Sequence, residues 1–316
     1  MTTDNRESLL RQTEKTNVFK NPMGGTAGLH EKECAGKRNG IGCAVMSSEW
    51  STLPRTTADF PFRLGVTSYV YPADILPNVE KVAPVVDDVE LVLFETGKLP
   101  SLEAVERLAE LRAQHDLTYT VHLPIDKQLG SANPAERAAM TAGILNILRL
   151  TAPLAPHAYI VHLGGITATA AAAEVRRWQQ DVAVALEKIL AAGTASSLFC
   201  VETLDYPMAW CDPLLDTFGL SVCLDVGHLW RYRFSVADHL GRYLPRTRVV
   251  HLHGEQDGRD HLSLEVVDEA RMNTIGQALV NFSGVVTLEL FGYDVAAASI
   301  RRLAAWWQKN AASQCL

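Results

Sequence analysis

Eight short apolar runs, each followed by a segment with helical spacing, constrain the fold of this chain more than any other feature. The runs span residues 63–70, 89–95, 118–123, 158–164, 198–203, 221–228, 248–254 and 285–290. They are near-continuously apolar, as expected of parallel strands that are covered on both faces. Segments such as SLEAVERLAELRAQ place apolar residues at i, i+3 and i+4, along one face of a helix. Eight strand-then-helix units predict a (β/α)8 barrel over residues 59–316.

Local signals along the chain agree with this architecture. Ser101 and Pro134 are typical of helix N-termini, and Gly193 stands where a helix end needs a left-handed residue. A doubly wound open sheet, the alternative α/β architecture, usually carries a Gly-rich phosphate loop after its first strand. The segment GVTSYVYP contains no G-x-G-x-x-G pattern. The fold class is therefore predicted to be α/β, as one TIM barrel with an N-terminal extension.

Residues 1–58 differ from the rest of the chain. They are polar, show no sustained period of either kind, and are expected to form a flexible leader. Their His30, Cys34 and Cys43 lack the close C-x₂₋₄-C pairs of a structural zinc site. The leader holds 8 Lys and Arg against 6 Asp and Glu, which leaves residues 59–316 with a charge of −9.

Composition excludes several classes of protein. The net charge of −7 argues against a protein that binds a nucleic-acid backbone by bulk charge. The chain has no run of about 18 apolar residues and no apolar signal segment near its start, so we expect a cytoplasmic protein without a membrane partner. Cys200 and Cys223 fall inside apolar runs, which argues against a disulfide framework. The motifs of Ser hydrolases, P-loop proteins and C-x-x-C redox proteins are missing from the sequence.

A histidine or an acidic residue ends six consecutive runs. These residues are His122, His162, Glu202, Asp225, His251 and Glu289. Singly, each is more often a core or helix-capping residue than a ligand. The carboxyl ends of all barrel strands open on one face, however, and so many ionisable groups in one apolar mouth would be costly without a compensating cation. The sequence therefore predicts a divalent metal centre.

The ligand types favour zinc, manganese, iron or cobalt over calcium, which prefers oxygen ligands alone. Asp225 and His228, in LDVGH, can both point into the mouth while facing different ions. So many ligands exceed one coordination shell, and two or three metals are expected.

The loop HLHGEQDGRDHLSL adds a further candidate ligand, His261, next to an apolar pair that would anchor the loop. His253 and Asp257, in the same loop, are equally consistent with solvated surface. Three other histidines are interpreted as structural: His115, His157 and His239.

Aromatic and basic residues just outside the strands are candidates for substrate binding. Trp230, Arg231 and Tyr232 follow the sixth run, and Tyr69 follows the first. Such side chains can stack on a base or macrocycle and pair with phosphate. A surface patch at a helix start accounts for them equally well.

At its strand-end residues the chain resembles the xylose-isomerase-like barrels, a superfamily that joins sugar isomerases and epimerases with AP endonucleases of the endonuclease IV type. The resemblance covers about residues 60–310. It rests on Glu202, Asp225-x-x-His228, His251 and Glu289. The epimerase branch holds one metal with that set. The endonuclease branch adds histidines on strands 3 and 4 and an Asp-x-His after strand 7, and it holds three zinc ions.

His122 and His162 match the added histidines, whereas Asp260 and His261 are adjacent rather than separated by one residue. The resemblance therefore implies a phosphoesterase with two metals and leaves the third open. It implies that Glu202 bridges two ions, that His122 and His162 hold the first, that Asp225, His251 and Glu289 hold the second, and that His228 and His261 go to a third.

A more specific resemblance lies in TSYVYPADILPNVE (67–80) and DDVELVLFE (87–95). Both segments look like the cobamide-remodelling hydrolases of the same superfamily, which open the nucleotide loop of cobalamin-type corrinoids at a phosphoester and leave cobinamide. The resemblance implies a metal-dependent phosphodiester hydrolase acting on a small-molecule corrinoid, with Glu202 and Glu289 in its catalytic centre.

Three alternatives stay open at this point. One is a sugar isomerase or epimerase with a single Mn²⁺ or Co²⁺ and Glu202 and Glu289 as its acid/base pair. Another is an AP endonuclease acting on DNA, which the charge of residues 59–316 disfavours. The third is a non-catalytic corrinoid or metal carrier, which no sequence feature favours over catalysis.

Overall fold

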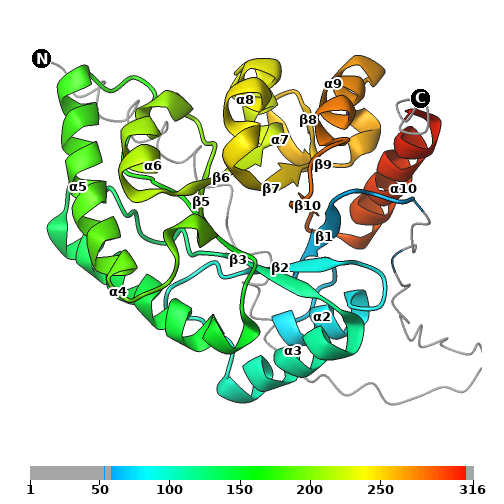
Figure 1. Cartoon of the computed structure of the whole chain (residues 1–316), viewed down its shortest axis with the longest axis horizontal. Helices are drawn as coiled ribbons and strands as arrows, with labels where there is room; N and C mark the ends of the chain where they lie inside the picture. The colour runs from blue at the N-terminus through cyan, green and yellow to red at the C-terminus, as the bar shows by residue number, and fades with distance from the viewer. Residues whose placement is uncertain (1–52, 54–57, 311–316) are drawn as a thin grey trace, which may run out of the picture. The chain divides into compact units, whose positions relative to one another are not determined.

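The computed structural model describes Leu53 and residues 58–310. Within them, eight parallel strands close into a barrel in the order β1-β10-β7-β6-β5-β4-β3-β2. The strands are β1 (Arg63–Thr67), β2 (Asp88–Val92), β3 (Thr118–His122), β4 (Ala158–Val161), β5 (Phe199–Glu202), β6 (Ser221–Asp225), β7 (Thr247–Leu252) and β10 (Val285–Leu288). Figure 1 shows the first strand, β1, beside the last, β10, where the barrel closes. The predicted (β/α)8 barrel is confirmed, and each predicted run matches one barrel strand, with β2 and β7 beginning one residue earlier than predicted.

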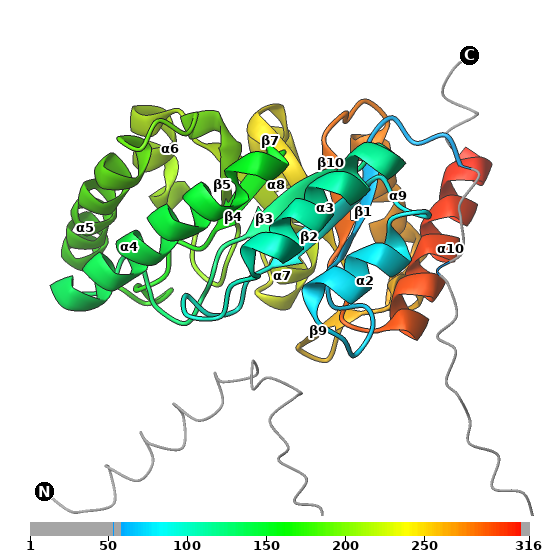
Figure 2. The same ribbon diagram turned by 90° about the horizontal axis from the view of Figure 1, so that it is seen from below.

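Helices follow the strands and cover the outside of the barrel. They are α2 (Ile75–Val82), α3 (Leu102–His115), α4 (Pro134–Thr151), α5 (Ala172–Leu190), α6 (Asp212–Phe218), α7 (Val226–Arg231), α8 (Val236–Tyr243), α9 (Glu269–Leu279) and α10 (Tyr293–Asn310). Short 3-10 turns are η2 (Ala152–Leu154), η3 (Ser196–Leu198), η4 (Met208–Trp210), η5 (Leu244–Arg246) and η6 (Leu264–Val266). Figure 2 shows α2, α3, α4 and α5 following one another around one side. The predicted leader, apart from Leu53 and Ala58, lies outside the described residues.

The predicted helix signals act as expected. The Ser101 hydroxyl accepts a hydrogen bond from the Ala104 N–H at 3.1 Å and so caps α3. Pro134 is the first residue of α4, where its missing N–H costs nothing. Gly193, just after α5, has a φ of +90°, which residues with a side chain rarely adopt. Local chemistry therefore fixes where these helices begin and end.

A small apolar layer fills the lower part of the barrel interior. It consists of Ala158, Ile160, Cys200, Cys223, Val249 and Val285. Burial raises the pKa of the Cys200 thiol to about 12, so this sulfur is a neutral, apolar group at physiological pH. The three described cysteines, Cys200, Cys211 and Cys223, are free and buried. The apolar layer closes the barrel below the strand ends.

The polar segment after β7, expected to be a loop, contains a β-hairpin. Its strands are β8 (Gly254–Gln256) and β9 (Arg259–Leu262), paired antiparallel. Asp257 and Gly258 form the two-residue turn with φ values of +55° and +76°, and Asp-Gly is the favoured sequence for such a turn. The hairpin packs against α7 and so stands over the barrel mouth. Among the helices that the structure describes, none combines the length and the apolar character that a membrane span requires.

Candidate metal centre

The alternation of side chains along each strand turns the strand-end residues into the barrel. Glu202, Asp225 and His251 each follow a residue of the apolar layer by two positions on their own strand. Residues two apart on a strand share one face, so these side chains lie above the apolar layer at the carboxyl end of the barrel. Their exposed fractions are 1%, 0% and 0%. The six predicted strand-end residues meet at this one mouth.

Glu202 lies at the centre of the first group of ligands. Its Oε2 is 3.3 Å from Nε2 of His122 and 2.9 Å from Nε2 of His162. Its Oε1 is 3.2 Å from Nδ1 of His228. Ligand atoms of His122, His162 and Glu202 all lie within 4.8 Å of one another, close enough to share one ion.

A second group shares the same glutamate. It comprises Glu202, Asp225, His251 and Glu289, whose ligand atoms also lie within 4.8 Å of one another. His251 Nδ1 is 3.1 Å from Glu289 Oε2 and 3.9 Å from an oxygen of both Glu202 and Asp225. The structure therefore brings together all the residues of the predicted first and second metal positions.

Glu90 of β2, which the sequence interpretation missed, orients one of these histidines. The Nε2–H of His251 donates to Glu90 Oε2 at 2.8 Å, and both residues are fully buried. In the neutral ring that a metal would require, this bond places the lone pair of His251 on Nδ1, toward the other carboxylates. The Nδ1–H of His122 donates in the same way to the Leu123 carbonyl at 3.0 Å, which leaves Nε2 facing Glu202. A second partner of this kind is typical of metal-ligating histidines.

A third group of ring nitrogens lies next to the second group. It comprises His228, His253 and His261. The Nδ1–H of His228 donates to the Thr203 carbonyl at 3.1 Å, and the Nδ1–H of His261 donates to the Glu289 carbonyl at 2.9 Å. In the neutral rings, these bonds place the lone pair on Nε2. His228 Nε2 lies 3.8 Å from Asp260 Oδ2, which is also paired with Arg231.

Solvated surface was one of two interpretations left open for His253 and Asp257, and the structure supports it for Asp257 but not for His253. His253 is fully buried, whereas Asp257 is exposed at the hairpin turn. His253 stands two positions after His251 and continues the inward side of the alternation. Extending the period of two past the end of the apolar run would have identified it.

Buried atoms without hydrogen bonds test whether cations fit this site. Within the part of the chain that the structure describes, Glu202 Oε1, His251 Nδ1 and Glu289 Oε2 are buried and make none. His251 Nδ1 and Glu289 Oε2 lie 3.1 Å apart within the second group, and Glu202 Oε1 lies 3.2 Å from Nδ1 of His228. Such atoms are costly unless a partner satisfies them, and imidazole nitrogens with carboxylate oxygens suit zinc, manganese, iron or cobalt. The donor set therefore fits divalent cations.

The pKa values of the same residues show what these cations would replace. Burial by itself would lower the pKa of His122 and His228, but Glu202 raises the first to about 9, and Asp225 with Glu202 raises the second to about 10. Burial would raise the pKa of Glu202, yet the charge of His162 and hydrogen bonds from neighbouring histidines hold it well below its ordinary value. Protons on the histidines thus balance the carboxylates, and a bound cation would displace them.

Aromatic side chains form a shelf beside the mouth. Tyr69 and Phe94 have ring centroids 5.0 Å apart, Phe94 and Phe291 are 6.2 Å apart, and Phe291 is 5.3 Å from the ring of His261. The three aromatic residues follow β1, β2 and β10, which are neighbours in the barrel. Tyr69 was a predicted substrate-binding residue, whereas Phe94 and Phe291 were not identified from the sequence.

The other predicted substrate-binding residues lie around α7. Tyr232 is 37% exposed, and its ring lies 5.9 Å from that of His228, at the mouth. Arg231 pairs with Asp260 beside the third group. Trp230 instead packs on the core under the guanidinium of Arg271 in α9, 5.3 Å from its ring. Contact of Arg231 and Tyr232 with substrate stays a prediction.

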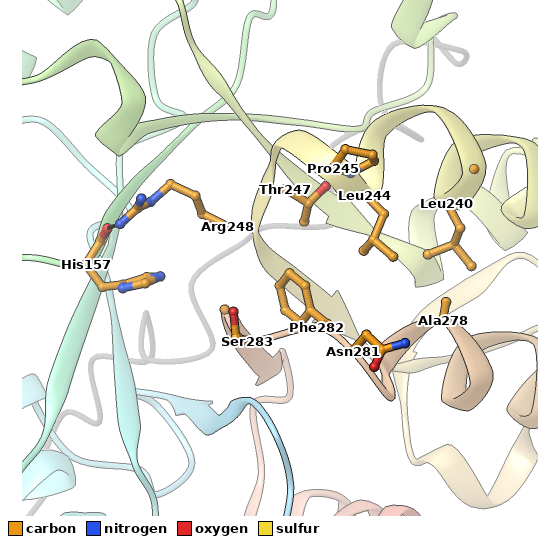
Figure 3. A pocket seen from close by; sticks show the side chains of 12 residues that line it. His157, Leu240, Leu244, Pro245, Thr247, Arg248, Ala278, Asn281, Phe282 and Ser283 are labelled. Atoms are coloured by element: carbon orange, nitrogen blue, oxygen red, sulfur yellow. Dashed lines mark hydrogen bonds between the residues drawn. The ribbon is translucent and has the colours of Figure 1, made fainter. Parts of the chain in front are cut away.

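A cavity of 690 Å³ lies at the opposite end of the barrel. It is lined by Arg248 at the start of β7, Gly284 just before β10 and His157 just before β4. Figure 3 shows Arg248 and His157 together at one side, with Leu240 and Leu244 along another. The cavity lies at the amino ends of β4, β7 and β10, so it is separate from the metal centre.

Comparison with solved structures finds the same barrel in proteins with different activities. A D-tagatose 3-epimerase-like protein has 20% identity and a TM-score of 0.64, over 81% of this chain and 100% of its own. Endonuclease IV from Thermus thermophilus has 20% identity and a TM-score of 0.61, over 78% and 99%. The IolI protein with a bound zinc atom has 12% identity and a TM-score of 0.59, over 80% and 99%.

No protein-family model and no curated protein sequence matches the chain. The similar structures therefore show the fold alone, a closed (β/α)8 barrel, as the sequence predicted. At these identities they do not choose between an epimerase and a phosphoesterase. That choice depends on the site itself.

Proposed function

We propose that this chain is an enzyme, a metal-dependent phosphodiester hydrolase. The observation that carries the proposal is that Glu202 belongs to two ligand groups, one with His122 and His162 and one at the ends of β6, β7 and β10. Each group has its ligand atoms within 4.8 Å of one another, and together they hold six residues, more than one four-coordinate ion accepts, so two cations fit. Paired metals of this kind favour displacement at phosphorus, because they stabilise both the attacking and the leaving oxygen.

The chain's own residues have separable roles in this proposal. Glu202 would hold two cations about its carboxylate, while Glu90 keeps the His251 ring in the tautomer that offers Nδ1. Zinc, or alternatively manganese, cobalt or iron, would supply the Lewis acid that lowers the pKa of water and neutralises charge on the leaving oxygen. Arg231, held beside the mouth by Asp260, would pair with a phosphate oxygen of the substrate.

We propose that the substrate is a cobamide, cut at the phosphoester of its nucleotide loop. The two segments that resemble cobamide-remodelling hydrolases, 67–80 and 87–95, contribute Tyr69, Glu90 and Phe94 to the mouth. The shelf of Tyr69, Phe94 and Phe291 suits a large flat ligand, because aromatic faces stack on planar rings. Bound cations would also reverse the sign of this acidic mouth and so admit a phosphodiester.

The test is to incubate protein loaded with zinc, manganese or cobalt with adenosylcobalamin and to separate the corrinoids by chromatography. We expect a cobinamide-type product. Glu202→Ala should abolish it while the far-UV circular dichroism stays that of the wild type, since a ligand at the mouth contributes little core packing. Absence of product with every metal would refute the substrate assignment.

A single-metal sugar epimerase is the second candidate, because the D-tagatose 3-epimerase-like protein shares the fold. It predicts one tightly bound metal per chain, and activity that survives replacement of His122 and His162. Elemental analysis of the loaded protein separates the two proposals, since the hydrolase requires at least two ions. Incision of abasic duplex DNA by the same sample would instead identify an AP endonuclease.

A further inference from the structure

Both ring nitrogens of His253 are engaged inside the protein. The backbone N–H of His261 donates to Nδ1 of His253 at 2.9 Å, and the Gly254 carbonyl is farther from the same nitrogen, at 3.3 Å. A backbone N–H can only donate, so Nδ1 carries the lone pair and the proton of the neutral ring is on Nε2. Nε2 lies 3.1 Å from Oδ1 of Asp225 and 3.3 Å from its Oδ2. The Nε2–H therefore donates to Asp225.

We propose that His253 is a positioning residue that fixes the carboxylate of Asp225, and that it is not itself a metal ligand. This inference rests on the proposed function, in which Asp225 holds a cation. Asp225 Oδ1 already accepts the backbone N–H of His228 at 2.7 Å, as the N-cap of α7. The bond from His253 is a second restraint on the same carboxylate. Together they resist its rotation, and outer partners of this kind orient metal-ligating carboxylates.

The backbone of α7 is built to receive the His253 ring. A Cβ atom added to Gly227 would lie 1.9 Å from Cε1 and 2.2 Å from Nδ1 of His253. These separations are far below van der Waals contact, so only glycine leaves room for the ring at this position. Gly227 lies between Asp225 and His228 in the LDVGH segment. This close approach explains why residue 227 is a glycine.

His253 also connects the β8–β9 hairpin to Asp225. The rings of His253 and His261 stack with centroids 4.2 Å apart and an interplanar angle of 27°. His261 has a φ of +51°, an uncommon conformation for a residue with a side chain, and its N–H points at the His253 ring. The imidazole of His253 thus links the hairpin to Asp225, a residue of the second group.

Two isosteric variants separate the two ends of this ring. The amide nitrogen of His253→Gln reaches the place of Nε2 and retains a donor to Asp225. The amide oxygen of His253→Asn reaches the place of Nδ1 and retains an acceptor for the His261 N–H, but it leaves Asp225 without its donor. Zn²⁺ affinity is measured by competition with a chelator, and Co²⁺-loaded samples are compared by visible absorption, which reports ligand geometry.

We expect His253→Asn to lower the affinity for one Zn²⁺ by about 10- to 100-fold and to shift the Co²⁺ absorption spectrum. The affinity of His253→Gln should stay within about threefold of the wild type. Equal losses in both variants would mean that the ring is a ligand or only fills space, and would overturn the proposal. Wild-type affinity in both variants would overturn it as well.

Gly227→Ala is a second test, for use if His253→Asn does not fold, because it displaces the same ring without changing His253. Its methyl group must displace the imidazole, so we expect the same loss at one Zn²⁺ and the same spectral shift. Wild-type binding by a folded Gly227→Ala protein would contradict the inference. None of these measurements uses a substrate. The metal-binding results can therefore be interpreted even if the protein is not a hydrolase. Likewise, failure of the His253 proposal would not refute the hydrolase assignment.

Discussion

Glu90 offers a direct test of the metal centre, because it contacts a ligand without belonging to the predicted ligand set. Its Oε2 accepts the Nε2–H of His251 at 2.8 Å, and neither residue is exposed. Glu90→Gln retains an acceptor of nearly the same size but removes the charge that makes His251 a stronger ligand. Glu90→Ala removes both. Asp88→Asn is the matched control, since Asp88 shares the inner face of β2 but bonds to Thr118.

The expected magnitude follows from the kind of contact. Loss of an outer-shell partner usually costs about 10- to 100-fold in metal affinity, or about 1.4 to 2.7 kcal/mol. We expect the lower figure for Glu90→Gln and the higher for Glu90→Ala. Because metal stabilises only the folded state, the gain in Tm on loading should shrink by about 3–5 °C for Glu90→Gln in a domain of this size.

The assay is a chelator competition with Zn²⁺, together with thermal unfolding of metal-free and metal-loaded protein. The ion held with His122 and His162 should lose less affinity than the ion held with His251, because Glu90 lies near His122 but hydrogen-bonds to His251. The reasoning is refuted if Glu90→Ala binds both ions as the wild type does, or if Asp88→Asn loses as much affinity as Glu90→Ala.

Further predictions concern the other parts of the site and the core. His162→Ala should reduce the metal content by one ion per chain in elemental analysis, and an unchanged count would argue against the two-group arrangement. The raised pKa values of His122 and His228, about 9 and 10, mean that both are protonated near neutral pH without metal. Zn²⁺ binding should therefore release protons and weaken as pH falls, which calorimetry in two buffers of different ionisation enthalpy measures; binding without proton release would contradict it. Gly276→Ala would place a methyl group 2.1 Å from Trp306 and should lower the free energy of unfolding by about 1–3 kcal/mol in urea titration, whereas an unchanged midpoint would contradict the packing argument.

Much of the site was predictable because two short-range regularities act together. Strands covered on both faces read as apolar runs, and all their carboxyl ends share one face of the barrel. A polar residue at the end of a run, such as Glu202 or His251, is therefore placed in the mouth by its position alone. The same regularity would have placed His253 there, had the alternation been followed beyond the end of the run.

Pairings across the barrel were not predictable in this way. Glu90 lies between apolar residues near the start of its run, and its partner His251 is 161 positions away on a strand that is not its neighbour. The pairing of Arg231 with Asp260, and the packing of Trp230 under Arg271, likewise depend on how α7 meets the hairpin and α9. A sequence pattern describes one helix or strand at a time and carries no information on the contacts between them.

The sequence by itself determined the barrel and the strand-end ligands, because both follow from periods of two and 3.6 residues and from the shared direction of parallel strands. The tertiary structure alone decided the orientation of those ligands. Which nitrogen of His251 faces the cations, and what holds the carboxylate of Asp225, depend on Glu90 and His253 through contacts a few ångströms long. Such contacts form only once the barrel has closed and the hairpin has settled on α7.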